Sequence, residues 1–358
     1  MIESTQYRPD FVTPPGDTLQ ETLDALHMSQ ADLAKRMDRP VKTINEIIKG
    51  KAAITPATAL QLERVTAVSA SFWNAREARY REYLVAEEER SRLERNVDWL
   101  SEVPVAAMMK LRWIPPVKSK VDRSRAVLNF FGVASRAVLM KGVQRTNYRQ
   151  STAYEVNPWA VAAWLRQGTI EAREVRCERY DEARFRETLE WARSLTASSD
   201  PDFAESLRDS CRESGVALVF VPELPKTRTW GATRWLSPSK ALIQMSLRYK
   251  TDDHFWFTFF HEAAHVLKHR KRGEFIQGAA TKPSREEDEA NRFAAEFLIP
   301  EAQYKRFLST NWNTKTSICR FASSLRISPG IVVGRLQHDG HVAHSRFNDL
   351  KVKLDWRT

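Results

Sequence analysis

The stretch Phe257-Thr-Phe-Phe-His261-Glu-Ala-Ala-His265 carries the strongest signal in the chain for both fold and chemistry. It continues a segment that begins near Asp252 and has the apolar spacing of a helix. Side chains four residues apart lie on one helical face, so His261 and His265 can offer imidazole nitrogens to one Zn²⁺. Glu262 lies beside them, and H-E-x-x-H is the pattern of zinc metallopeptidases, with the glutamate as general base. We therefore predict a catalytic zinc site here.

A catalytic zinc ion takes three protein ligands and leaves one position for water, so a third ligand is needed. His269 is two turns from His261, about 12 Å along a helix axis, which is too far for one tetrahedral site. A second helix is predicted over 284–300, and Glu289 lies at the edge of its apolar face, with Glu286 as the main rival. Two imidazoles and one carboxylate leave the zinc acidic enough to lower the pKa of a bound water toward about 7. The motif glutamate can then accept the proton.

The sequence around this motif predicts an α+β domain. Residues 216–221 form an apolar run typical of a buried strand, and residues 241–247 alternate well enough to be another. The second strand could bind an extended peptide at a sheet edge or simply complete the sheet. Residues 318–340 resemble a helix-turn-helix in pattern, but we interpret them as a helical cap. We expect a zincin-like domain over 201–358.

The N-terminal part predicts a bundle of short helices between residues 15 and 65. Ser29 is placed as an N-cap with Asp32 three residues later, which is close to a capping box. Pro40 suits the start of a third helix, and Thr55-Pro56 the start of a fourth. The third helix has four apolar residues on one expected inward face: Val41, Ile44, Ile47 and Ile48.

The predicted fold class is mainly α with a small β-sheet, divided into four parts. Residues 1–70 form an all-α helix-turn-helix bundle, and residues 71–103 form a long, charged connecting helix. Residues 104–200 are a helical middle region without a readable role, and residues 201–358 form the α+β domain. The net charge of +11 favours a polyanionic partner such as nucleic acid.

Composition also excludes some classes of protein. No apolar run approaches the ~18 residues of a membrane helix, and the first fifteen residues do not read as a secretory signal, so we expect a cytoplasmic location. The three cysteines, Cys177, Cys211 and Cys319, lie far apart without C-x-x-C spacing, so we expect reduced side chains and neither a cysteine zinc ribbon nor a disulfide framework.

Residues 257–265, together with Glu289-Ala-Asn291, Phe293-Ala294 and Leu298-Ile-Pro300, resemble the ImmA/IrrE family of bacterial metallo-endopeptidases. The resemblance covers about residues 218–300. It implies that the two histidines and Glu289 bind zinc, that Glu262 is catalytic, and that the protein cleaves or releases a repressor. Ala264 stands where the family often has glycine; because alanine is also small, we expect little effect.

Residues 15–51 resemble the Xre-type helix-turn-helix of the HigA antitoxins, and the likeness continues through 54–60 and 71–73. The resemblance implies a recognition helix over 40–49 in the major groove of operator DNA, in a homodimer that represses its own operon and neutralises a toxin. Ser29 and Gln30 would lie at a phosphate or a base. The expected base contacts are Lys42, Thr43 and Asn45, and the expected backbone contacts are Lys49 and Lys51.

Together these patterns predict a transcriptional regulator, an autorepressor or antitoxin, with a Zn²⁺-dependent endopeptidase domain that cleaves a partner protein or itself. The alternative is a non-enzymatic antitoxin or repressor whose zinc domain binds a toxin or a signal. A third hypothesis is a plain peptidase whose helix-turn-helix docks protein.

Overall fold

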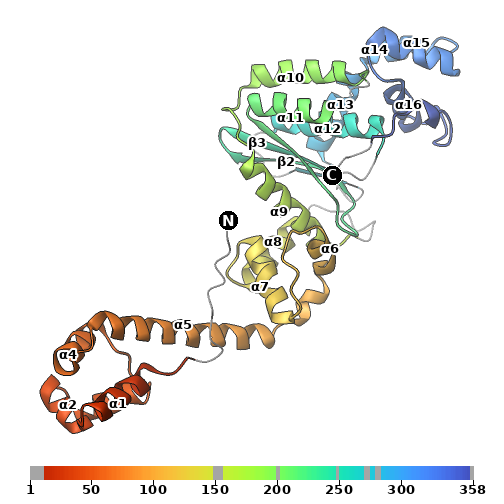
Figure 1. Ribbon diagram of the computed structural model, residues 1–358. Coiled ribbons are helices and arrows are strands. Elements are labelled where there is room, and N and C mark those ends of the chain that lie inside the picture. Colours follow the sequence, from red (N-terminus) through yellow and green to blue (C-terminus); the bar gives the residue numbers. More distant parts are fainter. Residues whose placement is uncertain are drawn as a thin grey trace. The chain divides into compact units, whose positions relative to one another are not determined.

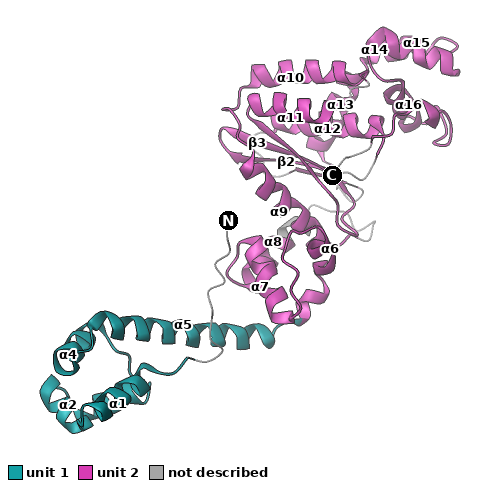
Figure 2. Cartoon of the chain, in the orientation of Figure 1, with its two compact units in different colours: residues 1–97 teal, residues 98–358 magenta. Residues whose placement is uncertain are grey.

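The computed structural model describes residues 12–147, 156–198, 202–246, 250–269, 275–278 and 284–354. The chain forms two compact units, residues 1–97 and 98–358 (Figure 2). The predicted fold class is confirmed, because the described residues are mostly helical and contain one small four-stranded sheet.

The first unit is an all-α bundle. Its helices are α1 (Pro15–Ala25), α2 (Gln30–Met37), α3 (Val41–Ile48), α4 (Pro56–Thr66) and α5 (Ala70–Glu94) (Figure 1). The predicted capping box at Ser29 and Asp32 is present at the start of α2. Trp73, in the first turn of α5, is fully buried in the core of the bundle. The long helix therefore begins as part of the helix-turn-helix core and not as a separate connector.

One detail of α3 differs from the sequence prediction. Ile44 and Ile47 are buried, as expected, but Val41 is 50% exposed. Val41 is the first residue of α3, where the helix extends past the bundle core. The inward face therefore begins one turn later than predicted, and an apolar side chain is left at the exposed end of the helix.

The second unit combines helices with the sheet. Its helical elements before the sheet are η1 (Asp98–Ser101), α6 (Val105–Lys110), α7 (Lys120–Phe131), α8 (Arg136–Asn147), α9 (Pro158–Glu174), α10 (Glu182–Leu195) and α11 (Phe203–Glu213). The strands are β1 (Val216–Val221), β2 (Thr229–Ser237), β3 (Lys240–Ser246) and β4 (Phe275–Gly278). The remaining elements are α12 (Asp252–Lys268), α13 (Arg285–Leu298), α14 (Glu301–Leu308), α15 (Lys315–Leu325), α16 (Pro329–His338) and η2 (Asn348–Leu350).

The sheet has the order β1-β3-β2-β4, with β1 parallel to β3 and the other two pairs antiparallel. Both faces are covered, which explains the continuous apolar run of β1. Leu218 faces a cluster formed with α11 and α12, whereas its neighbour Val219 faces the cluster of α9. Figure 1 shows α9 on one side of the sheet and α10 to α12 on the other.

This packing changes two expectations. Helices α9 and α10 pack into the two clusters that cover the sheet. The expected boundary between residues 104–200 and 201–358 therefore lies within one compact unit of the structure. Strand β3 lies between β1 and β2, so it completes the sheet and cannot take up a peptide at an edge. Leu247, the last residue of the predicted strand, lies outside the described residues.

The C-terminal helices form a cap on α12. Ile331, Val332 and Leu336 of α16 are buried, so this helix has no free face for a DNA groove. The structure thus favours the cap over a second helix-turn-helix. Of the described helices, none is by itself long and apolar enough to span a membrane, although α7 and α8 pass such a test as a bent pair by length and composition alone.

Candidate functional site

Helix α12 positions the H-E-x-x-H motif in the centre of the second unit. The helix packs against β2 and β3 on one side and against α13 and α16 on others. Nearly every side chain of its middle part is buried, and His261, Glu262 and His265 are at most 1% exposed. Polar groups held this far from water need partners, and the partners define the site.

Three ligand atoms converge at this point. His261 Nε2 lies 3.1 Å from His265 Nε2. A carboxylate from α13, that of Glu287, lies 3.2 Å from His261 Nε2 and 3.5 Å from His265 Nε2. These three residues form the one group of metal-binding side chains found among the described residues.

The two imidazole nitrogens and the carboxylate lie at separations close to those of zinc ligands. In a tetrahedral site with bonds of about 2.0–2.1 Å, two ligand atoms are about 3.3–3.4 Å apart. His261 Nε2 and His265 Nε2 are 3.1 Å apart, and they lie 3.2 Å from Glu287 Oε2 and 3.5 Å from Glu287 Oε1, respectively, all close to this value. Two imidazoles and one carboxylate are also the ligand set of many catalytic zinc sites. The residues present therefore fit a zinc ion with one position left open.

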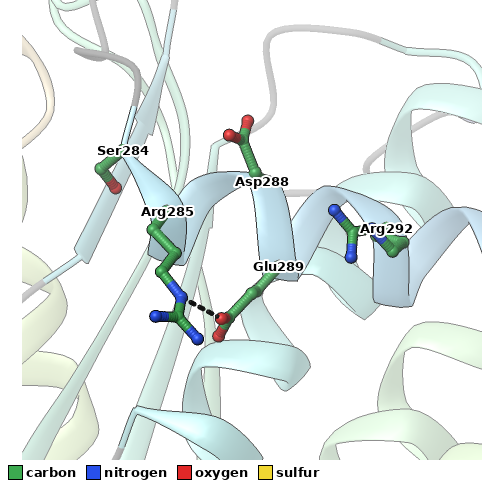
Figure 3. A pocket seen from close by; sticks show the side chains of 5 residues that line it. All are labelled: Ser284, Arg285, Asp288, Glu289 and Arg292. Atoms are coloured by element: carbon green, nitrogen blue, oxygen red, sulfur yellow. Dashed lines mark hydrogen bonds and ion pairs between the residues drawn. The ribbon is translucent and has the colours of Figure 1, made fainter.

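The structure places Glu287, and not Glu289, beside the two histidines. Glu289 is instead bound to Arg285 and His269, and Figure 3 shows it leaving α13 on a different side from Asp288. The reason is helical geometry, because Glu287 is three and seven residues before the buried Ala290 and Ala294 and shares their face. Glu289 is two residues further on and points elsewhere. The rival candidate, Glu286, is not part of the group either.

Hydrogen bonds fix how the histidines are oriented. His261 Nδ1 lies 2.9 Å from the side-chain oxygen of Asn291, so Nδ1 carries the proton and Nε2 keeps its lone pair. His265 Nδ1 lies 3.0 Å from His269 Nδ1, and His269 Nε2 lies 3.1 Å from Glu289 Oε2. His265 donates to His269, and His269 donates to Glu289. Such outer contacts orient metal ligands and increase their basicity.

Protonation states agree with this arrangement. Burial, helped by the neighbouring His261 and His269, lowers the pKa of His265 to about 2, so this imidazole is neutral and able to bind a metal. The hydrogen bond from His269, followed by that from Arg285, lowers the pKa of Glu289 to about 2. Glu289 is therefore an anionic acceptor that supports His269.

Glu262 occupies a fully buried place beside β2. The Thr233 hydroxyl donates to Glu262 Oε2 at 2.7 Å, while Oε1 has no hydrogen-bond partner in the described part of the chain. Burial raises the pKa of Glu262 well above its usual range, against the opposing effect of Thr233. Gly231 leaves the room for this carboxylate, because a Cβ there would lie 2.4 Å from Oε1. The second oxygen is thus free to exchange a proton.

A cavity of about 620 Å³ adjoins the cluster. Glu287 and Asn291 line it, together with the aromatic side chains of Trp230 and Phe257 and the aliphatic side chain of Leu298. Many polar and charged side chains line it as well, among them Asp253, Arg335 and Lys351. The cavity offers room for a substrate side chain next to the three ligand atoms.

The predicted DNA-contacting residues gather on α2, α3 and the turn after α3. Lys42 has an 85% exposed side chain, and Lys49 and Lys51 are also exposed. Asn45 Nδ2 donates to Gln30 Oε1 at 3.3 Å, so these two amides from different helices lie together. The exposed hydroxyl of Ser29 is engaged in its capping box, and Thr43 is half-buried. The structure brings this set to one region of the first unit.

Comparison with known proteins separates the same two regions. Residues 19–73 match the helix-turn-helix family model, and residues 223–337 match that of peptidase family M78, described as an IrrE N-terminal-like domain. The chain is 39% identical over 59 residues to the uncharacterised helix-turn-helix transcriptional regulator YddM of Escherichia coli. That match spans 16% of this chain and 63% of YddM, so the chain covers less than two thirds of that relative.

Solved structures of two antitoxins resemble a quarter of the chain. The HigA-family antidote protein of Coxiella burnetii is 28% identical, with a TM-score of 0.22, over 24% of this chain and 92% of its own. Pseudomonas aeruginosa antitoxin HigA, solved with higBA promoter, is 25% identical, with a TM-score of 0.23, over 24% of this chain and 95% of its own.

Proposed function

We propose that this protein is a DNA-binding regulator whose second unit is a zinc endopeptidase acting on a partner protein or on the chain itself. The observation that carries the enzymatic part is the convergence of His261, His265 and Glu287 on one point, with the buried Glu262 next to them. The match to peptidase family M78 supports the same assignment.

In this proposal, His261, His265 and Glu287 hold the ion. When bound, zinc supplies Lewis acidity toward a peptide carbonyl and lowers the pKa of a nearby water molecule. Glu262 accepts a proton from the attacking water at Oε1 and passes it to the leaving amine. Thr233 holds Oε2 throughout, so only one oxygen has to exchange the proton. Burial raises the pKa of Glu262 above its usual range, which favours the protonated form that donates to the leaving amine.

Cleavage is tested with the full chain and Glu262→Gln. Each purified protein, loaded with zinc, is incubated alone and with the products of the neighbouring genes, and new peptide termini are read by mass spectrometry. We expect new termini with wild type. Their amount should be lower by about 10²-fold or more with Glu262→Gln and unchanged with Glu82→Gln, a control at an exposed site. If wild type and Glu262→Gln give the same termini, the zinc domain is a binding surface, as in a non-enzymatic antitoxin.

The DNA-binding part rests on the helix-turn-helix match and on the exposed lysines of α3 and the following turn. We propose an operator in the DNA upstream of the protein's own gene, bound by a homodimer as closed-symmetry regulators are. A gel shift with Lys42→Ala/Asn45→Ala should show weaker binding by on the order of tenfold or more. Arg92→Ala, an exposed control on α5, should bind as wild type. An unchanged shift with the double variant would instead favour a protein-docking role.

A further inference from the structure

The positive charge of the chain lies outside the helix-turn-helix unit. Residues 1–97 contain 14 Lys and Arg but 15 Asp and Glu, a net charge of −1, although the whole chain carries +11. Affinity for nucleic acid depends heavily on neutralising phosphates. The excess positive charge of the chain therefore lies outside the first unit.

The excess is concentrated around α6, α7 and α8. Residues 104–143 contain eight Lys and Arg and a single acidic residue, Asp122, a net charge of +7 in 40 residues. Asp122 is paired with Arg125 at 3.3 Å, and Arg123 donates to the Val117 carbonyl. The other six cations are exposed and have no ion pair within the described residues: Lys110, Arg112, Lys118, Lys120, Arg136 and Lys141.

The packing of this region presents the cations outward on a fixed scaffold. Val127 of α7 and Leu139 of α8 are buried, and both helices contact α9. Arg166 of α9 donates to the Phe130 carbonyl at 2.8 Å, which fastens the end of α7. Lys120, Arg136 and Lys141 thus stand on helices that contact α9, which itself packs on the sheet, whereas Arg112 and Lys118 lie in the segment between α6 and α7. We define residues 104–143 as the basic surface.

We propose that the basic surface is a second DNA contact, which binds the phosphate backbone of duplex DNA without reading its sequence. The proposal rests on the DNA binding proposed above. Exposed lysine and arginine side chains without acidic partners bind phosphates by releasing counterions. Duplex DNA is favoured over an anionic membrane, because the apolar side chains of α7 face the protein interior and Val138 is the only large apolar residue of this surface that the structure describes as exposed.

The test compares salt dependence in two charge-matched variants of the full chain. The first, Lys118→Gln/Lys120→Gln/Lys141→Gln, removes three charges from the basic surface. The second, Arg176→Gln/Arg306→Gln/Arg320→Gln, removes three exposed charges elsewhere in the same unit. Binding to a short duplex of scrambled sequence is measured by fluorescence anisotropy between about 50 and 200 mM salt. Thermal unfolding of each variant verifies that its fold is intact.

We expect the first variant to bind the scrambled duplex at least about tenfold more weakly at about 0.1 M salt, with a log–log salt slope reduced by about 1 to 3. The second variant should keep the wild-type slope. An unchanged slope in the first variant, or an equal reduction in both, would overturn the proposal. So would a first variant that binds duplex DNA normally but loses binding to phosphatidylserine vesicles.

Failure of this inference can be told apart from failure of the proposed operator binding. Thr43→Ala/Asn45→Ala should reduce the preference for upstream DNA over scrambled duplex. It should leave the salt slope of binding to the scrambled duplex unchanged. If wild type shows no preference for upstream DNA, the operator hypothesis fails, but the slope comparison still decides whether the basic surface binds phosphates.

Discussion

At the scale of single residues, the proposed chemistry depends on the protonation state of Glu262. Its carboxyl group is fully buried, bound by one hydroxyl and otherwise surrounded by protein, so its charged form is disfavoured. The same burial that suits it to proton transfer makes it a cost to folding once it ionises. This conflict between stability and chemistry is common at functional sites.

Glu262→Gln should therefore stabilise the metal-free protein in a pH-dependent way. The pKa of Glu262 is raised on folding. Its contribution to the free energy of unfolding is therefore fully present below the unfolded pKa of about 4.3 and is lost as the pH rises through the folded pKa. Wild type should be less stable than Glu262→Gln by more than about 1 kcal/mol at about pH 7.5, with little difference near about pH 4.5. Urea unfolding at several pH values in excess chelator measures this. A difference that does not change with pH would contradict the assigned burial.

At the scale of elements, the long periodic helices were predictable and the finer contacts were not. Strands β1 and β3 and helices α12 and α13 follow from apolar runs and spacing. Strand β4 has four residues and β2 carries an irregular register, so neither gives a clear pattern.

The sequence prediction chose the wrong one of two neighbouring glutamates as the side chain that lies beside His261 and His265. Glu287 is the one that shares a stripe with Ala290, Ala294 and Leu298, and that stripe was readable at intervals of three, seven and eleven residues. The role of His269 was not readable, because it depends on where α13 places Glu289. Thr233 likewise reaches the site only through the pairing of β2 with its neighbours.

The contact between β2 and α12 gives a prediction at this scale. Gly231→Ala would place a Cβ 2.4 Å from Glu262 Oε1 and 2.8 Å from its Cδ. Because the carboxyl group is buried, the strand must shift, and we expect a loss of about 1–3 kcal/mol in the free energy of unfolding. Gly142→Ala on α8, where an added Cβ would meet no side chain or other element of the described residues within 4 Å, should instead be neutral or stabilise by up to about 1 kcal/mol. Urea unfolding of both variants decides; equal stabilities would mean that Gly231 does not shape the site.

At the scale of the whole molecule, the two units have separate cores. The first is held together by a bundle core that includes Leu33, Ile44 and Trp73, and the second by the clusters on either face of the sheet. The proposed metal joins α12 to α13 and lies entirely within the second unit. Any stabilisation by zinc should therefore be confined to that unit.

Calorimetry of the full chain tests this separation. With free zinc at about 100 times its dissociation constant, binding adds about 2.7 kcal/mol to the stability of the second unit. A chelator should lower the midpoint temperature of the second unit's transition and leave that of the first unit unchanged. Leu62→Ala, in the core of the first unit, should shift only the first unit's transition. A chelator that shifts both transitions together would show that the units unfold as one.

The proposed zinc site is tested most directly by the zinc affinity of wild type, Glu287→Gln and Glu289→Gln, measured by competition with a chromophoric chelator. We predict about one zinc per chain in wild type. Glu287→Gln should lose nearly all of it, and His261→Ala should serve as the reference for a missing ligand. Glu289→Gln should still bind one zinc, weakened by about 10-fold to 100-fold because His269 loses its acceptor. Zinc that survives in Glu287→Gln but vanishes in Glu289→Gln, or a wild-type chain that binds none, would contradict the account.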